Sequence, residues 1–106
     1  KREIMKDLNP KIVCADGFTM SVQARKGAYC TPRCDYPAFP HTHVECGFPS
    51  SIPMTAELRG YAEALCGCYE NEECDYTDTV YGYVPVEIVK AELSLHGGIV
   101  EGIMPL

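Results

Sequence analysis

The dipeptide Asp16-Gly17 constrains the fold most strongly, because a strand-like run lies on each side of it. Residues 11–15 form a short run with β preference, and residues 18–24 alternate with a period of two. The apolar positions of this second run share one face: Phe18, Met20, Val22 and Ala24. Two such runs joined by Asp-Gly predict a β-hairpin.

Three more segments have strand patterns. Residues 28–31 follow a turn at 25–27 and end at Pro32, which predicts a short third strand. Residues 42–48 alternate, with Val44, Cys46 and Phe48 on one face, and predict a fourth strand. Residues 79–84 predict a fifth strand, in which Val80, Gly82 and Val84 lie opposite Tyr81 and Tyr83. Prolines at three positions between 32 and 41 favour irregular structure there.

Two helices are predicted. Thr55 can cap a helix from Ala56 to about Leu65, and residues 86–96 form an apolar stripe that follows Pro85 and stops at Gly97-Gly98. The expected order is β-β-β-β-α-β-α, and the tail 99–106 is either an edge strand or disordered. The sequence therefore predicts an α+β fold, with a small, mostly antiparallel sheet of about five strands packed against two helices.

The length and composition favour one globular domain over residues 1–106. The chain is 46% hydrophobic and 23% charged, which excludes wholesale disorder. No apolar stretch approaches the ~20 residues of a membrane helix, and the first thirty residues contain no apolar signal core. We therefore expect no membrane partner, a cytoplasmic location and fraying of residues 1–10.

The formal charge of −6 is distributed unevenly along the chain. In residues 1–33, seven basic groups against three acidic ones give +4, whereas in residues 34–106 two against twelve give −10. Residues 60–89 contain no lysine or arginine. Such a chain gains little from neutralising phosphates, so we expect no direct nucleic-acid binding. The acidic segment is either a solubilising loop or a surface that attracts a basic partner.

Several segments carry a family resemblance: CADGFTMSVQA at 14–24, YCTPR at 29–33, THVECGFPS at 42–50 and TVYGYVP at 79–85. Together with the block 86–98, they resemble a small family of accessory proteins encoded by phages and prophages. The resemblance implies a protein made inside an infected bacterial cell. Many such proteins bind and disable host machinery, and anti-CRISPR proteins are the best known class. The acidic, cysteine-containing segment 67–78 resembles an insertion into the family pattern.

The odd number of cysteines, seven, argues against a disulfide framework in a chain without an export signal. One candidate zinc site combines Cys30 and Cys34 with His41 and His43. A second combines Cys66, Cys68 and Cys74 with Cys46 or Asp75. The alternative is that Cys14, Cys30 and Cys46 are small buried hydrophobes. A Cys–His nucleophile and base would come from the same first group, but no third, orienting residue is evident, so we expect no enzyme.

The leading hypothesis is a non-enzymatic, anti-CRISPR-like inhibitor whose carboxylates replace nucleic-acid phosphates on a basic surface of a host protein. Its predicted contact residues are Glu70, Glu72, Glu73, Asp75, Asp78, Tyr69, Tyr76, Tyr81 and Tyr83. One alternative is a nucleotide-binding protein that uses Arg25, Lys26 and Arg33, and another is a zinc-stabilised interaction module. The formation of a homodimer is a further possibility that the sequence leaves open. His96 is expected to complement the dipole at the end of its helix.

Overall fold

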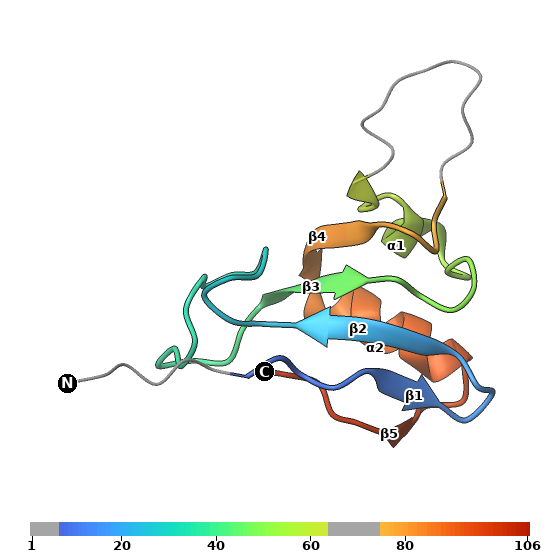
Figure 1. Cartoon of the computed structure of the whole chain (residues 1–106), viewed down its shortest axis with the longest axis horizontal. Helices are drawn as coiled ribbons and strands as arrows, with labels where there is room; N and C mark the ends of the chain where they lie inside the picture. The colour runs from blue at the N-terminus through green and yellow to red at the C-terminus, as the bar shows by residue number, and fades with distance from the viewer. Residues whose placement is uncertain (1–6, 64–74) are drawn as a thin grey trace, which may run out of the picture.

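The computed structural model describes residues 7–63 and 75–106, and it confirms the small α+β fold (Figure 1). Five antiparallel strands form one sheet in the order β4-β3-β2-β1-β5. The elements are β1 (Ile12–Cys14), β2 (Thr19–Gln23), β3 (His43–Gly47), α1 (Ala56–Arg59), β4 (Val80–Pro85), α2 (Val86–Leu95) and β5 (Ile99–Glu101).

The predicted hairpin is present and joins β1 to β2. Ile12 lies opposite Met20 in the ladder. Asp16 accepts a hydrogen bond from the N–H of Phe18 at 2.9 Å, and Gly17 has a φ of 92°, a conformation that glycine adopts without steric cost. The register places Ile12, Met20 and Val22 in the core, as the alternation predicts.

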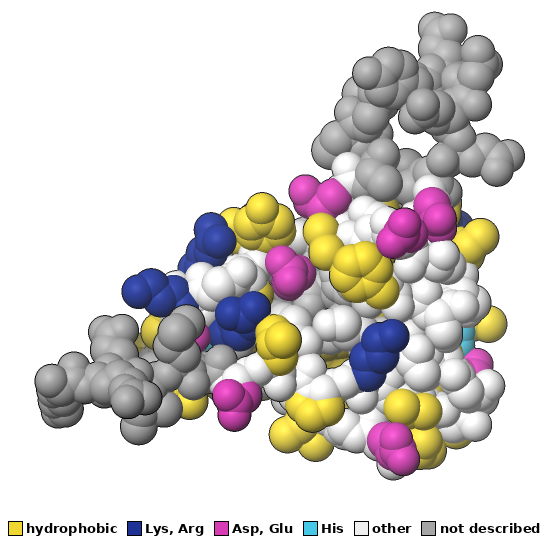
Figure 2. Space-filling view, in the orientation of Figure 1, with side chains coloured by type: hydrophobic (Ala, Val, Ile, Leu, Met, Phe, Trp, Pro, Cys, Tyr) yellow, Lys and Arg dark blue, Asp and Glu magenta, His cyan; other side chains and the backbone are white. Residues whose placement is uncertain are grey.

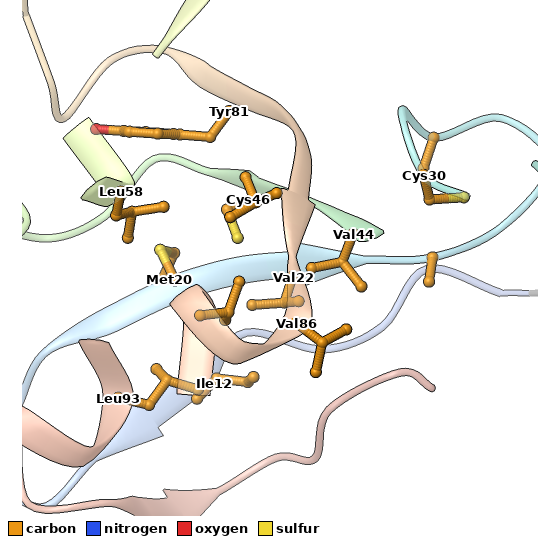
Figure 3. Packing of buried hydrophobic residues seen from close by; sticks show 14 of the residues in the cluster. Ile12, Met20, Val22, Cys30, Val44, Cys46, Leu58, Tyr81, Val86 and Leu93 are labelled. Carbon is orange, nitrogen blue, oxygen red and sulfur yellow. The ribbon is translucent and has the colours of Figure 1, made fainter. Parts of the chain in front are cut away.

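One hydrophobic core fills the space between the sheet and the helices. In Figure 1, α2 lies across one face of the sheet, and Val89 and Leu93 on that helix are buried. Figure 3 shows Leu93 beside Ile12. It also shows Leu58 of α1, which belongs to the same core cluster as Met20 and Tyr81. Since the burial of one such apolar side chain contributes roughly 1.5–3 kcal/mol, this cluster is the main source of stability.

The predicted strand at residues 28–31 does not form. Its only ladder contact is an isolated bridge between Thr31 and His43. The chain turns instead, because the N–H of Ala28 donates to the carbonyl of Arg25 and the N–H of Cys30 donates to that of Ala28. Pro32 then offers no donor to extend the pairing. The fifth strand of the sheet is instead β5. It lies in the tail 99–106, for which the sequence allowed either an edge strand or disorder.

The first helix is shorter than predicted. The side chain of Thr55 accepts from the N–H of Leu58 at 3.3 Å, so the predicted cap is confirmed. The α-helix nevertheless ends at Gly60, and Ala62 instead forms a bridge to Tyr81. Pairing with β4 therefore competes with continuation of the helix. The predicted helical residues 64 and 65 lie outside the described residues.

The alternation predicted for β4 is interrupted. Tyr81, Gly82 and Val84 are all buried, whereas Tyr83 is exposed. The register of β3 against β4 shifts between Val44 and Cys46, as in a β-bulge. The extra residue breaks the two-residue repeat, so Tyr81 and Tyr83 do not share a face.

Residues 1–6 of the segment predicted to fray lie outside the described residues, whereas Asn9 is hydrogen-bonded to the rest of the fold. The N–H of Asn9 donates to the side-chain oxygen of Gln23 at 2.8 Å, and the Gln23 amide donates back to the Asn9 carbonyl at 2.8 Å. The Asn9 side chain also donates to the carbonyls of Val22 and Ile103. This residue therefore links β2 to the C-terminal segment.

Candidate functional site

The predicted acidic contact surface is only partly described. Asp75 and Asp78 are exposed, while Glu70, Glu72, Glu73 and Tyr69 lie outside the described residues. A carboxylate oxygen of Asp75 accepts from the hydroxyl of Thr77 at 2.7 Å and from its N–H at 3.1 Å. These two hydrogen bonds lower the pKa of Asp75, so its negative charge is held at the start of the segment that leads into β4.

Two of the predicted tyrosines belong to the core instead. Tyr81 is fully buried, and its hydroxyl donates to the carbonyl of Tyr76 at 2.5 Å. Tyr76 is half-buried and packs against the core cluster. Both residues are therefore anchors of β4, and Tyr81, a predicted contact residue, is buried and cannot contact a partner.

Tyr83 is exposed and forms a pair with Tyr29, which was not among the contact residues predicted from the sequence. The ring centroids are 5.7 Å apart at an interplanar angle of 25°, and the N–H of Tyr83 donates to the carbonyl of Tyr29 at 3.0 Å. The exposed fractions are 39% for Tyr29 and 45% for Tyr83. Tyr83 has a φ of 54°, which turns its side chain out of the sheet. A left-handed conformation costs roughly 1–2 kcal/mol in an L-residue, so the fold maintains this exposure against a local penalty.

Two carboxylates border this tyrosine pair. Glu45 accepts from the N–H of Tyr29 at 3.1 Å. A Cβ atom at Gly82 would lie 3.1 Å from an oxygen of Glu63 and 3.4 Å from the Cβ of Tyr29. The absence of a side chain at Gly82 therefore lets Glu63 and Tyr29 lie close to the backbone of β4. We call this surface the tyrosine face, defined by Tyr29, Glu45, Glu63, Gly82 and Tyr83.

The carboxylates of the tyrosine face are not neutralised by basic side chains of the described chain. In residues 7–63 and 75–106, both ion pairs involve His96 and none involves a lysine or arginine. Figure 2 shows Asp and Glu side chains towards the end of the molecule where α1 and the start of β4 lie, and Lys and Arg side chains gathered towards the β2–β3 connection. Their charge is therefore available to an external cation.

A second polar cluster joins the buried His96 and Glu92 to the exposed Asp16 of the hairpin turn. The two ring nitrogens of His96 lie 2.7 Å from a carboxylate oxygen of Asp16 and 2.7 Å from one of Glu92. Glu92 has no exposed surface, and it also accepts from Met54 and from Thr55. Phe18 stacks flat on the imidazole, with ring centroids 3.8 Å apart. With a carboxylate at each nitrogen, both nitrogens donate, and the ring is an imidazolium.

The protonation states in this cluster follow from its hydrogen bonds. Burial alone would lower the pKa of His96, but hydrogen bonds to Asp16 and Glu92 outweigh it and raise that pKa. Burial would raise the pKa of Glu92, but the N–H groups of Met54 and Thr55 lower it. No ring nitrogen of His96 is left to take a proton from a substrate, so the geometry gives the cluster a stabilising role. The position of His96 at a helix end was predicted from the sequence, but its contacts with Asp16 and Glu92 were not, although Glu92 lies one helical turn away.

The first candidate zinc group does not converge. Cys30 is buried and its thiol donates to the carbonyls of Arg25 and Pro32. His41 lies 3.0 Å from the carbonyl of Cys34, and His43 lies 2.8 Å from the hydroxyl of Thr42. Within the described part of the chain, no three His, Cys, Asp or Glu side chains are arranged to hold a metal ion. Of the second group, Cys66, Cys68 and Cys74 lie outside the described residues.

The cysteines of the strands behave as apolar core residues, as the alternative interpretation predicted. Cys14 and Cys46 are buried, and Figure 3 shows Cys46 among the core side chains. Burial raises the pKa of the Cys14 thiol and of the Cys46 thiol. Both are therefore protonated and unsuited to metal binding or nucleophilic attack near neutral pH.

No family model, curated protein or solved structure matches this chain. Among the described residues there is also no helix with the length and apolar character that crossing a bilayer requires.

Proposed function

We propose that this chain is a non-enzymatic binding protein whose tyrosine face captures a basic, arginine-rich protein surface. The observation that carries the proposal is the exposed Tyr29–Tyr83 pair, which is bordered by two carboxylates without a basic partner in the described chain. Tyrosine supplies contact area at a low entropy cost and is enriched where interfaces derive most of their binding energy.

The chemistry of this surface favours a cationic partner. An aromatic ring face attracts a guanidinium or ammonium group, and an adjacent carboxylate adds a charge-assisted hydrogen bond. Arg33 of the chain itself shows this affinity, since its guanidinium carbon lies 5.3 Å from the centroid of the Tyr29 ring. The acidic segment continues from Glu63 to Asp78, on the chain that leads into β4. Steering by these charges should accelerate the encounter.

The resemblance to phage and prophage accessory proteins suggests which basic surface is bound. We propose a component of host defence, as for anti-CRISPR proteins, whose basic surface normally holds nucleic acid. The carboxylates of Glu63, Asp75 and Asp78 would then occupy places taken by phosphates, together with the predicted contacts Glu70, Glu72 and Glu73. The chain would act inside the bacterial cell.

A pull-down from the bacterial host, read by mass spectrometry, tests this proposal. Wild type is compared with Tyr83→Ala and with Phe39→Ala, which removes an aromatic side chain that is 79% exposed and lies outside the tyrosine face. We expect one nucleic-acid-binding defence protein to be captured by wild type and by Phe39→Ala, and about 30-fold weaker capture by Tyr83→Ala, since a hot-spot residue contributes ~2 kcal/mol. Added nucleic acid should compete with the chain for that protein. Equal capture by both variants, or no competition, would reject the proposal.

A further inference from the structure

A basic cluster lies in the connection between β2 and β3. It consists of Arg25, Lys26 and Arg33, in the region where Figure 2 shows Lys and Arg side chains gathered. Over the described ranges none of the three forms an ion pair with a carboxylate. Within the described residues, no carboxylate therefore neutralises their positive charge through an ion pair.

Arg33 is held in one orientation by the protein. Its Nε donates to the carbonyl of Lys26 at 3.2 Å, and its guanidinium lies over the ring of Tyr29. The two terminal nitrogens make no hydrogen bond to the described residues. A guanidinium that is fixed at Nε presents these nitrogens as a fork, which matches two oxygens of one anion.

Arg25 offers a second, unsatisfied donor close by. Its Nε is buried and has no hydrogen-bond partner. Its side chain folds back over the turn, since a Cβ at Gly27 would lie 2.5 Å from a terminal nitrogen of Arg25. A buried donor without a partner is rare in folded proteins because its desolvation is not repaid. Because this Nε is buried, an anion at the turn would contact the Arg25 guanidinium through its terminal nitrogens.

We propose that Arg25, Lys26 and Arg33 form a binding site for the phosphate group of a small ligand such as a nucleotide. A phosphate dianion has enough acceptor oxygens for two guanidinium groups and one ammonium group. This site adjoins the tyrosine face, because the Arg33 guanidinium lies over Tyr29, but phosphate binding does not require the proposed protein partner.

The carboxylates around the site favour a small ligand over a nucleic-acid chain. Asp35 accepts from the N–H of Lys26 at 2.8 Å, and Glu45 lies beside Tyr29. These groups and the net charge of −6 repel an extended polyanion, whereas one phosphate group contacts only the cluster.

Calorimetric titration of the full chain with inorganic phosphate, and then with ADP, tests the site at fixed ionic strength. We expect saturable binding that Arg33→Gln weakens by about tenfold or more, because hydrogen bonds to charged groups are strong. Arg33→Lys, which keeps the charge but loses the fork, should weaken it less. Lys90→Gln removes an exposed positive charge on α2 and should leave the affinity unchanged.

Gly27→Ala separates position from charge, since the new methyl group must displace the Arg25 guanidinium while the net charge stays the same. We expect this variant to bind phosphate more weakly, with an unchanged melting temperature. Tighter binding of ADP than of phosphate would identify a nucleotide site, and equal binding would identify a site for phosphate alone. Absence of saturable binding, or equal effects of Arg33→Gln and Lys90→Gln, would overturn the proposal.

Discussion

His96 and Glu92 form a buried ion pair, with the ring Nε2 lying 2.7 Å from the carboxylate Oε2 on the same helix. Through Asp16 the pair reaches the β1–β2 turn, and through Thr55 it reaches the start of α1. The His96–Glu92 pair thus links α2 to the β1–β2 turn and to the start of α1. Taking such charges out of water is costly, so the geometry must be maintained for the pair to contribute to stability.

The stability that this cluster contributes should be greatest between about pH 4.5 and 6.5. The pKa of Glu92 is lowered from 4.5 and that of Asp16 from 3.8, so their contribution is complete above these values and is lost as the pH falls through the lowered ones. The pKa of His96 is raised from 6.5, so its contribution is complete below 6.5 and is lost as the pH rises through the raised value. Cys14 also faces these carboxylates, but its pKa is raised from 9.0 and it stays neutral in this range.

Urea unfolding of wild type and His96→Gln from pH 3 to pH 9 measures this contribution. The difference in unfolding free energy should be largest inside the window and shrink on both sides. A difference that does not change with pH would show that the cluster does not titrate as the structure indicates.

Removing the buried carboxylate should be severely destabilising. Glu92→Ala removes the acceptor of the His96 Nε2, of the Met54 N–H, and of the Thr55 N–H and hydroxyl, and breaking a buried pair in this way costs about 3–5 kcal/mol. Glu87→Ala, at an exposed position of the same helix, should change stability by less than ~0.5 kcal/mol. Chemical denaturation of the two variants makes the comparison, and similar losses would contradict the assignment of Glu92.

The two tyrosines of β4 should respond oppositely to truncation. Tyr81→Ala removes a fully buried ring and should cost about 3–5 kcal/mol. Tyr83→Ala should cost less than ~1 kcal/mol, because its ring is 45% exposed and its left-handed backbone is strained in either residue. Thermal denaturation of the two variants makes the comparison. Equal destabilisation would indicate that Tyr81 and Tyr83 are equally buried, as the regular alternation predicted from the sequence implies.

The side-chain hydrogen bonds of Asn9 to Val22 and Ile103 should make a measurable contribution to stability. Asn9→Ala keeps its backbone hydrogen bonds to Gln23 but removes the side-chain links to Val22 and Ile103, and we expect a loss of about 1 kcal/mol. Amide exchange should accelerate in the C-terminal segment near Ile103. Unchanged exchange there would show that the side chain does not tie the two segments together.

The parts of the fold that depend on local pattern were predictable from the sequence. The Asp16-Gly17 turn fixes the hairpin, and the apolar stripe of α2 lies between Pro85 and Gly97. The burial of Cys14 and Cys46 likewise follows from alternation. Each of these signals lies within a few residues of the element that it predicts.

The features that depend on distant or irregular contacts were not predictable. His96 and Asp16 are 80 residues apart in the sequence, and nothing in either local pattern points to the other. The bulge that separates Tyr81 from Tyr83 arises from the register with β3. The contact of Tyr29 with Tyr83 was not predictable, because residues 28–31 have strand preference and only the observed turn places Tyr29 against Tyr83. Most of the predicted acidic contacts fall in residues 64–74, outside the described chain.

The salt dependence of binding to the captured host protein tests the central claim most directly. The affinity of the chain for that protein is measured across a range of salt concentrations for wild type and for two double variants. Glu63→Lys/Asp78→Lys reverses two charges of the proposed contact surface, and Glu87→Lys/Glu101→Lys reverses two exposed charges elsewhere. If the tyrosine face and its acidic neighbours bind a cationic surface, only the first double variant binds much more weakly and has a flatter salt dependence. Equal affinities and equal slopes for both double variants would contradict the account.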